Sequence, residues 1–300
     1  MPFVYSDSVN IHFRTGVGHG PTILLAHGFL MDESMFDPIR TILAHNEINV
    51  VAWDARGHGR TGYGPDPRFD FWDLAEDGLR VLDAIGAETA VVGGMSQGGY
   101  AALRMALLAP ERVSGLALLN TEADACTRAD EIRYEDFFDK WCGTAELVPL
   151  AEQLAPDLIG GDRPDIWRWW ITRWLTHDRA AIHAAARCLV DRDSVLSRLG
   201  EITAPALVLR GEHDRSSTAE KCARQARRHP GATGVHTIAG AGHRCAHTQP
   251  DQEAPAQHGL IETLGHLEEN GGGAAVQVGD RQQKLHCCAS TSMNTPSSQR

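Results

Sequence analysis

The sequence predicts an α/β fold, with a mostly parallel central sheet and helices on both faces. Three observations predict it. Short apolar runs typical of buried strands alternate with helical patterns through residue 120. The alternation resumes at Ile202. Between these parts, from about Glu122 to Leu199, helical patterns follow one another without a convincing strand, which indicates a helical insertion after the sixth strand.

The elements can be justified in order along the chain. Apolar runs predict strands over 21–26, 48–53, 89–93, 113–119, 206–209 and 235–238. A helix is expected over 73–85, because its apolar residues recur at helical spacing: Leu74, Leu79, Val81, Leu82 and Ile85. A second helix is expected over 98–109, directly after a glycine-rich turn. Pro255 to Leu267 is consistent with a last amphipathic helix.

The insertion is rich in tryptophan, with five of the seven tryptophans of the chain. Trp167, Trp170 and Trp174 fall at i, i+3 and i+7, which places them on one helical face. Packing of the insertion against the main domain explains such a face. An apolar pocket wall explains it as well, and one face can serve both purposes. These three residues are therefore candidate substrate-binding residues.

The domain boundaries follow from these patterns. Residues 1–121 and 200–268 are expected to form one α/β core, and 122–199 a helical cap. Residues 269–300 begin with Glu-Asn and three glycines and continue rich in Ser, Thr and Gln, a composition that predicts a disordered tail. Deletion of 271–300 is accordingly expected to leave the melting temperature and the activity nearly unchanged.

The most informative motif is Gly94-Met95-Ser96-Gln97-Gly98. It reads G-x-S-x-G and lies between a predicted strand and a predicted helix, as a nucleophile elbow requires. A turn this tight strains the serine backbone and needs small neighbours, and it presents the Ser96 hydroxyl beside the N-terminus of the helix. The strand and helix on either side make this short pattern specific, and Ser96 is the candidate nucleophile.

Partners for Ser96 follow in a suitable order. Asp214 ends an apolar strand and its polar turn, and His243 lies in a Gly-Ala-Gly-His segment after a short strand. They are the candidate acid and base of a catalytic triad. An earlier His27-Gly28-Phe29-Leu30 segment follows a strand as well. The backbone N–H groups of Phe29 and Gln97 are the candidate oxyanion-hole donors.

These motifs resemble those of the α/β-hydrolase superfamily from about Phe3 to Leu267. The segment from Trp53 to Gly62 looks like the D-x-R-G-x-G-x-S turn after the fourth strand of that family. The elbow and Val113 to Thr121 resemble the 3-oxoadipate enol-lactonase and small-esterase branch, although C–C hydrolases and cofactor-free haloperoxidases share these signatures. The resemblance implies an α/β-hydrolase fold with a helical cap, and a structural role for Asp54.

Some assignments stay open at this point. Glu122 and Asp124 also follow a strand, and some hydrolases place the triad acid there. Asp214 has an alternative role as a helix N-cap. His27 is expected to brace the oxyanion loop rather than to act as the base.

The expected reaction is hydrolysis of a small carboxylic ester or lactone through an acyl-enzyme, without cofactor or metal. The serine at the elbow argues against epoxide hydrolases and haloalkane dehalogenases, which need an aspartate there. Hydrolysis of a C–C bond in a ring-cleavage product and a haloperoxidase or perhydrolase reaction remain alternatives. A ligand receptor of the same fold is the alternative from outside the enzymes.

Composition excludes several other classes of protein. The formal net charge of −11 argues against a nucleic-acid partner. The N-terminal residues carry no signal-peptide pattern, and no apolar run reaches ~18 residues, so no membrane association is expected. Seven cysteines without a C-x-x-C pair favour reduced thiols and a cytoplasmic location. A homo-oligomer remains open.

Overall fold

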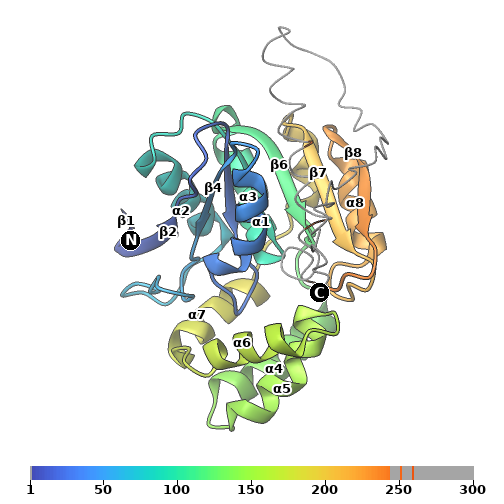
Figure 1. Cartoon of the computed structure of the whole chain (residues 1–300). Helices are drawn as coiled ribbons and strands as arrows, with labels where there is room; N and C mark the ends of the chain where they lie inside the picture. The colour runs from blue at the N-terminus through green and yellow to red at the C-terminus, as the bar shows by residue number, and fades with distance from the viewer. Residues whose placement is uncertain (1, 244–250, 252–258, 260–300) are drawn as a thin grey trace, which may run out of the picture.

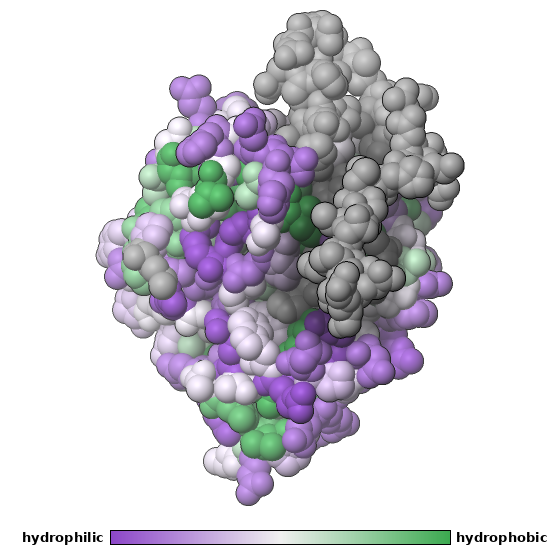
Figure 2. All heavy atoms as spheres, in the orientation of Figure 1, coloured by the Kyte–Doolittle hydropathy of each residue, from purple (hydrophilic) through white to green (hydrophobic). Residues whose placement is uncertain are grey.

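The structure is a computed structural model that describes residues 2–243, 251 and 259. The predicted tail over 269–300 and the predicted helix over 255–267 lie outside the described residues, apart from residue 259. Within that range no helix is long and apolar enough to cross a bilayer. The visible face of the molecule is largely hydrophilic, with apolar residues in small separate patches (Figure 2).

An eight-stranded sheet organises the described chain in the order β1-β2-β4-β3-β5-β6-β7-β8. The strands are β1 Phe3–Ser6, β2 Val9–Arg14, β3 Thr22–Ala26, β4 Asn49–Trp53, β5 Ala90–Met95, β6 Val113–Leu119, β7 Ala206–Gly211 and β8 Ala232–Ile238. From β4 to β8 every neighbouring pair is parallel, whereas β1 and β2 form an antiparallel hairpin that pairs with β4. The mostly parallel sheet predicted from the alternating pattern is therefore confirmed.

Helices cover both faces of this sheet (Figure 1). They are α1 Asp37–Ala44, α2 Phe71–Ala84, α3 Gln97–Leu108, α4 Arg128–Cys142, α5 Leu147–Ile159, α6 Pro164–Trp174, α7 Arg179–Val190 and α8 Ala219–Arg228, with short 3₁₀ helices at Glu33–Phe36, Pro110–Arg112 and Leu196–Glu201. Helix α2 begins two residues before the predicted start. Asp70 caps it there, because its side chain accepts hydrogen bonds from the N–H groups of Trp72 and Asp73.

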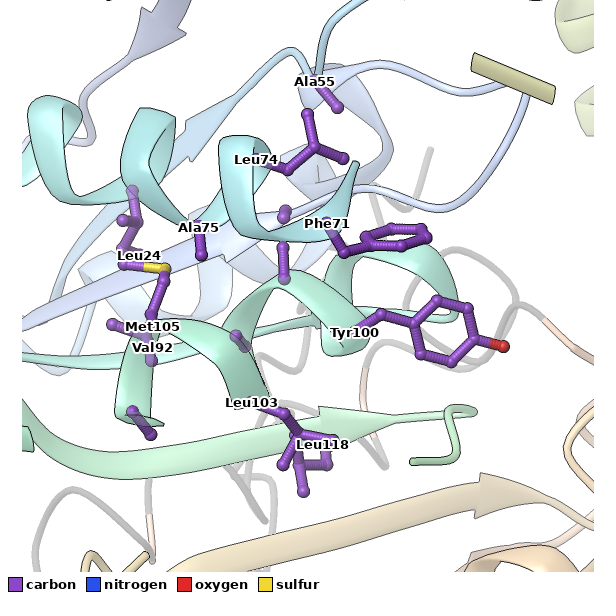
Figure 3. Packing of buried hydrophobic residues seen from close by; sticks show 14 of the residues in the cluster. Leu24, Ala55, Phe71, Leu74, Ala75, Val92, Tyr100, Leu103, Met105 and Leu118 are labelled. Atoms are coloured by element: carbon purple, nitrogen blue, oxygen red, sulfur yellow. The ribbon is translucent and has the colours of Figure 1, made fainter. Parts of the chain in front are cut away.

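Two apolar clusters follow from the alternation of side chains along each strand. Leu24, Val92 and Leu118 point to the face covered by α2, α3 and α8, where they pack with Phe71, Leu74, Leu103 and Met105 (Figure 3). Ile23, Leu25 and Val91 point to the opposite face, which α1 covers. The second cluster continues into the tryptophans of α4 and α6, so the insertion shares a core with the sheet.

The segment 122–199 contains four α-helices and no strand. In Figure 1 these helices, α4 to α7, lie together at one end of the sheet. The chain enters this segment from the carboxyl end of β6 and returns to β7. The parallel strands β3, β5, β6, β7 and β8 all end on that side, so the helices stand over the edge at which the candidate site residues follow their strands.

One buried histidine predicts a loss of stability in acid. Burial lowers the pKa of His229 from 6.5 to about 4. Between these values the unfolded chain binds more protons than the folded one, so stability falls as the pH falls from 6.5 toward 4. In His229→Asn the amide oxygen can still accept the hydrogen bond from Gly231 N–H that His229 Nδ1 now accepts at 3.1 Å. On going from neutral pH to pH 4.5, this variant is expected to lose about 2 kcal/mol less of its free energy of unfolding than the unmodified protein loses. Urea denaturation at pH 7 and 4.5 measures this, with the exposed His19→Asn as control. Equal losses for His229→Asn and the unmodified protein would contradict it.

Candidate active site

Ser96 occupies the turn between strand β5 and helix α3. Its backbone has φ 52° and ψ −113°, a conformation that residues other than glycine rarely adopt. Hydrogen bonds hold it there from two sides: its N–H donates to Leu119 O at 2.9 Å, and its carbonyl accepts from Thr121 Oγ1 at 2.8 Å. Because this strain is held by the neighbouring strand β6, Ser96 has the geometry expected of a nucleophile elbow.

The glycines of the motif allow the two arms of the elbow to pass. A Cβ on Gly98 would collide with the carbonyl group of Ala26 at the end of β3. A Cβ on Gly94 would collide with the same carbonyl and with the backbone of Gly98. These two positions therefore have to be glycine for packing reasons alone, since the backbones of β3, β5 and α3 meet there.

Asp214 and His243 are brought together, although 29 residues separate them. The imidazole Nδ1 of His243 lies 2.9 Å from Asp214 Oδ2, and both residues are buried. The other carboxylate oxygen, Oδ1, accepts hydrogen bonds from the N–H groups of Ser216 at 2.8 Å and Ser217 at 3.1 Å. The carboxylate is thus fixed by its own turn while it accepts from His243. Thr218, not Asp214, caps helix α8.

Asn120 connects the ends of strands β6 and β7 with the loop that follows β8, and sequence reasoning did not single it out. It is fully buried with φ 47°. Its side-chain amide donates from Nδ2 to Gly242 O at 3.0 Å, and its Oδ1 accepts from Gly211 N at 3.2 Å. The residue therefore ties the end of β6 to the end of β7 and to the loop that carries His243. The available signal was a polar residue directly after a buried strand.

The turn after β3 carries Phe29. It is closed by a hydrogen bond from Met31 N to Gly28 O at 3.1 Å. His27 braces it, as expected from the sequence: Ala55 N donates to Nε2 at 3.0 Å, so the ring proton is on Nδ1, which donates to Gly28 O at 2.8 Å. Within the described residues, neither Phe29 N nor Gln97 N forms a hydrogen bond with another backbone group. Among the residues that the structure describes, the arrangement is therefore compatible with the predicted role of these two N–H groups as oxyanion-hole donors.

The two rival acids pair with cations instead of with His243. Glu122 accepts from Lys221 Nζ at 3.0 Å and Arg192 NH2 at 3.2 Å. Burial raises the pKa of Glu122, although both cations act in the opposite direction. Asp124 forms an ion pair with Arg224. These contacts join the start and the end of the helical segment to α8, which is a structural role.

The three predicted cap tryptophans do not share one environment. Trp170 and Trp174 are fully buried in the cluster that joins the cap to the sheet. Trp167 is partly buried, and its indole N–H donates to Gly160 O at 3.2 Å. Gly160 in turn lies against Gly242, beside His243, where a Cβ on either residue would crowd the other backbone. Trp167 is thus linked through Gly160 to the loop of the candidate base.

A cavity of about 780 Å³ opens between the 57–64 turn and the end of α6. Polar groups dominate its lining, among them Asp32, Asp54, Arg60, Arg173 and His177. Ser96, Asp214 and His243 are not among the lining residues. Side-chain chemistry, rather than cavity volume, therefore locates the candidate active site.

Comparison with known proteins identifies relatives among hydrolases. The chain matches the family described as alpha/beta hydrolase fold over residues 21–245. It is 26% identical to 3-oxoadipate enol-lactonase 1 of Acinetobacter baylyi over 217 residues, which cover 68% of this chain and 75% of that protein. It is 35% identical to a putative carbamate hydrolase of Azorhizobium caulinodans over 126 residues, 42% of this chain and only 46% of that protein.

Solved structures give the same fold. A thermophilic esterase from Thermogutta terrifontis superposes with a TM-score of 0.79 at 24% identity, covering 88% of this chain and 98% of the esterase. At this identity the likeness concerns the fold alone. The sheet order, the elbow at Ser96 and the family match over three quarters of the chain lead to one conclusion: the chain belongs to the α/β-hydrolase fold family, and hydrolysis is the class of activity that this membership supports.

Proposed function

We propose that the protein is a serine hydrolase that cleaves a small carboxylic ester or lactone through an acyl-enzyme intermediate. The observation that carries the proposal is the strained backbone of Ser96 at the elbow, together with the buried pair of Asp214 and His243 on the loops after β7 and β8. This set supplies a nucleophile, a base and the group that orients the base, in the chain order of the fold.

The chemistry follows from these roles. His243 Nε2 accepts the proton of the Ser96 hydroxyl while Oγ attacks the carbonyl carbon of the substrate. The N–H groups of Phe29 and Gln97 stabilise the negative charge that develops on the carbonyl oxygen. The intermediate collapses, the C–O bond to the leaving alcohol breaks, and His243 returns its proton to that alcohol. In a lactone the alcohol stays in the same molecule.

Water completes the cycle. His243 accepts a proton from water, the resulting hydroxide equivalent attacks the acyl carbon, and the bond to Ser96 Oγ breaks. The carboxylic acid leaves, and the serine recovers its proton from His243. Asp214 accepts the Nδ1 hydrogen bond throughout, which keeps Nε2 directed to the reaction and stabilises the imidazolium. The balance requires only substrate and water.

An activity screen tests the proposal and separates it from its alternatives. We expect turnover of short p-nitrophenyl esters or of aromatic lactones, and labelling of Ser96 by a fluorophosphonate probe. A carbamate belongs in the screen because one relative is named as a putative carbamate hydrolase. If the protein cleaves only a ring-cleavage dienone, C–C bond hydrolysis replaces ester hydrolysis as its function. If it only forms peracids, the haloperoxidase or perhydrolase reaction does. A single turnover with retained product would indicate a receptor.

The size of the acyl group is expected to depend on Trp167. Trp167→Ala opens space beside the loop of His243 and should shift preference toward bulkier acyl groups, with the rate on p-nitrophenyl acetate falling less than ~100-fold. Trp170→Ala removes a fully buried ring and should instead lower stability by about 3–5 kcal/mol. Measured kcat/KM over acetate to octanoate esters, together with Tm, distinguishes the two. Unchanged specificity in Trp167→Ala would assign that ring to packing.

A further inference from the structure

The turn that carries Phe29 contains a second strained residue. Leu30 has φ 63°, in the left-handed region that a leucine avoids because its Cβ approaches the following carbonyl group. Leu30 is nevertheless fully buried, and its neighbour Met31 closes the turn back to Gly28. A bulky residue keeps such a conformation only when the surroundings hold it.

Helix α6 of the cap supplies two contacts that hold the turn. The indole Nε1 of Trp174 donates to Leu30 O at 2.8 Å, and both residues are buried. The preceding residue, Arg173, donates from Nε to Asp32 Oδ2 at 3.0 Å. Two consecutive residues of helix α6 therefore form hydrogen bonds to the turn, one to Leu30 and one to Asp32. A hydrogen bond excluded from water is stronger than an exposed one, so the Trp174 contact is well suited to fix a strained peptide.

The ionic contact persists over a wide pH range. Burial alone would raise the pKa of Asp32, but the hydrogen bonds from Ser34 and Arg173 outweigh it, so this pKa lies below its ordinary value. The Asp32 carboxylate therefore stays charged to a lower pH than an ordinary aspartate does, and its ion pair with Arg173 is kept.

Phe29 lies between the end of β3 and Leu30 in the chain. Its ring packs edge-on to His58 and against Phe138 of α4, with centroid distances of 5.2 and 5.0 Å. Rotation of the Leu30 peptide would tilt the turn and move the Phe29 N–H. The direction of that donor thus depends on the cap as well as on β3.

We propose that Trp174 is a positioning residue for the oxyanion hole: its indole N–H fixes the strained Leu30 peptide and so aims the Phe29 N–H at the reacting carbonyl oxygen. This role rests on the proposed function, because it requires Phe29 to be an oxyanion donor. In this proposal the oxyanion hole is complete only when the cap is packed on the sheet, because Trp174 belongs to the cap. This role also gives Trp174 a task other than contact with the substrate.

The effect should appear in kcat and leave KM nearly unchanged, because an oxyanion donor acts mainly in the transition state. Loss of one donor costs about 10²–10³-fold. Trp174→Phe keeps a ring in place and removes the N–H, so it should misdirect the donor and lower kcat by ~10–100-fold.

Trp141→Phe is the matched control. Trp141 is also fully buried, and its ring centroid lies 5.9 Å from that of Trp174. Its Nε1 has no hydrogen-bond partner in the part of the chain that the structure describes. The two substitutions remove the same atoms from one cluster, but only one removes a hydrogen bond. We expect Trp141→Phe to change kcat less than ~3-fold, within the range of a simple repacking.

A rescue experiment isolates the strain. Glycine adopts positive φ without penalty, whereas alanine does not. In the Trp174→Phe background, Leu30→Gly should therefore recover kcat by ~5-fold or more, and Leu30→Ala, which truncates nearly the same side chain, should not. Steady-state kinetics on p-nitrophenyl acetate at 25 °C, with Tm and circular dichroism for every variant, provides the readouts.

The outcomes separate this inference from the proposed function. If Ser96→Ala keeps its turnover, the proposed function fails and the role of Trp174 with it. If Ser96→Ala is inactive but Trp174→Phe matches Trp141→Phe in kcat, only the positioning role fails. The same holds if glycine and alanine at position 30 give equal kcat in the Trp174→Phe background.

Discussion

Ser96→Ala is expected to fold normally and to lose turnover by about 10⁶-fold. The alanine removes the oxygen that attacks the substrate, while the hydrogen bonds that hold the elbow all involve the backbone of residue 96. The remaining acceleration over water would come from the oxyanion donors and from binding. Initial rates on the best ester of the screen, with labelling by a fluorophosphonate probe, measure this loss.

Ser114→Ala provides the control for this substitution. Ser114 is partly buried near the start of β6, whereas the site lies beyond the ends of the parallel strands. The control should keep full activity and labelling. Turnover of Ser96→Ala within tenfold of the unmodified protein would remove Ser96 from the role of nucleophile and overturn the proposed reaction.

Asp214→Asn is expected to lower turnover by about 10⁴-fold at neutral pH. The asparagine oxygen can keep the hydrogen bonds from Ser216 and Ser217, which places the amide nitrogen toward His243 Nδ1. That nitrogen donates, so Nδ1 must accept, and the ring proton moves to Nε2. In this tautomer His243 cannot accept the proton of Ser96. The folded protein should keep its circular dichroism spectrum.

The rival acids complete the test. Glu122→Gln and Asp124→Asn should each cost less than ~10-fold in turnover, because these side chains pair with Lys221, Arg192 and Arg224. Glu122→Gln should lower Tm as well, since it leaves two cations without their buried counter-charge. The reverse ranking, with Asp214→Asn nearly silent, would move the acid to the junction of β6 and the cap.

The sequence alone predicted the parts of this protein in which local pattern determines structure. Buried parallel strands are short continuous apolar runs, so β3 to β7 were recognised within a residue or two. The elbow was recognisable from the sequence because backbones approach so closely there that only glycine fits at its flanking positions. The N-terminal hairpin and helix α1 were not predicted from the pattern. In β1 and β2 the chain reverses at Asp7 and Ser8, which both adopt positive φ. The Asn-Gly or Asp-Gly pair that most strongly signals a hairpin does not occur there.

Tertiary structure decided the questions that depend on distances between remote segments. Asp214, Glu122 and Asp124 all follow strands, and only the folded loops bring one carboxylate to His243 and direct the other two to cations. Spacing on one helix put Trp167, Trp170 and Trp174 together, yet Trp174 donates to Leu30, 144 residues away, while Trp167 contacts Gly160. The physical reason is that helical periodicity determines which side chains share a face, and only the packing of the cap on the sheet determines what that face meets.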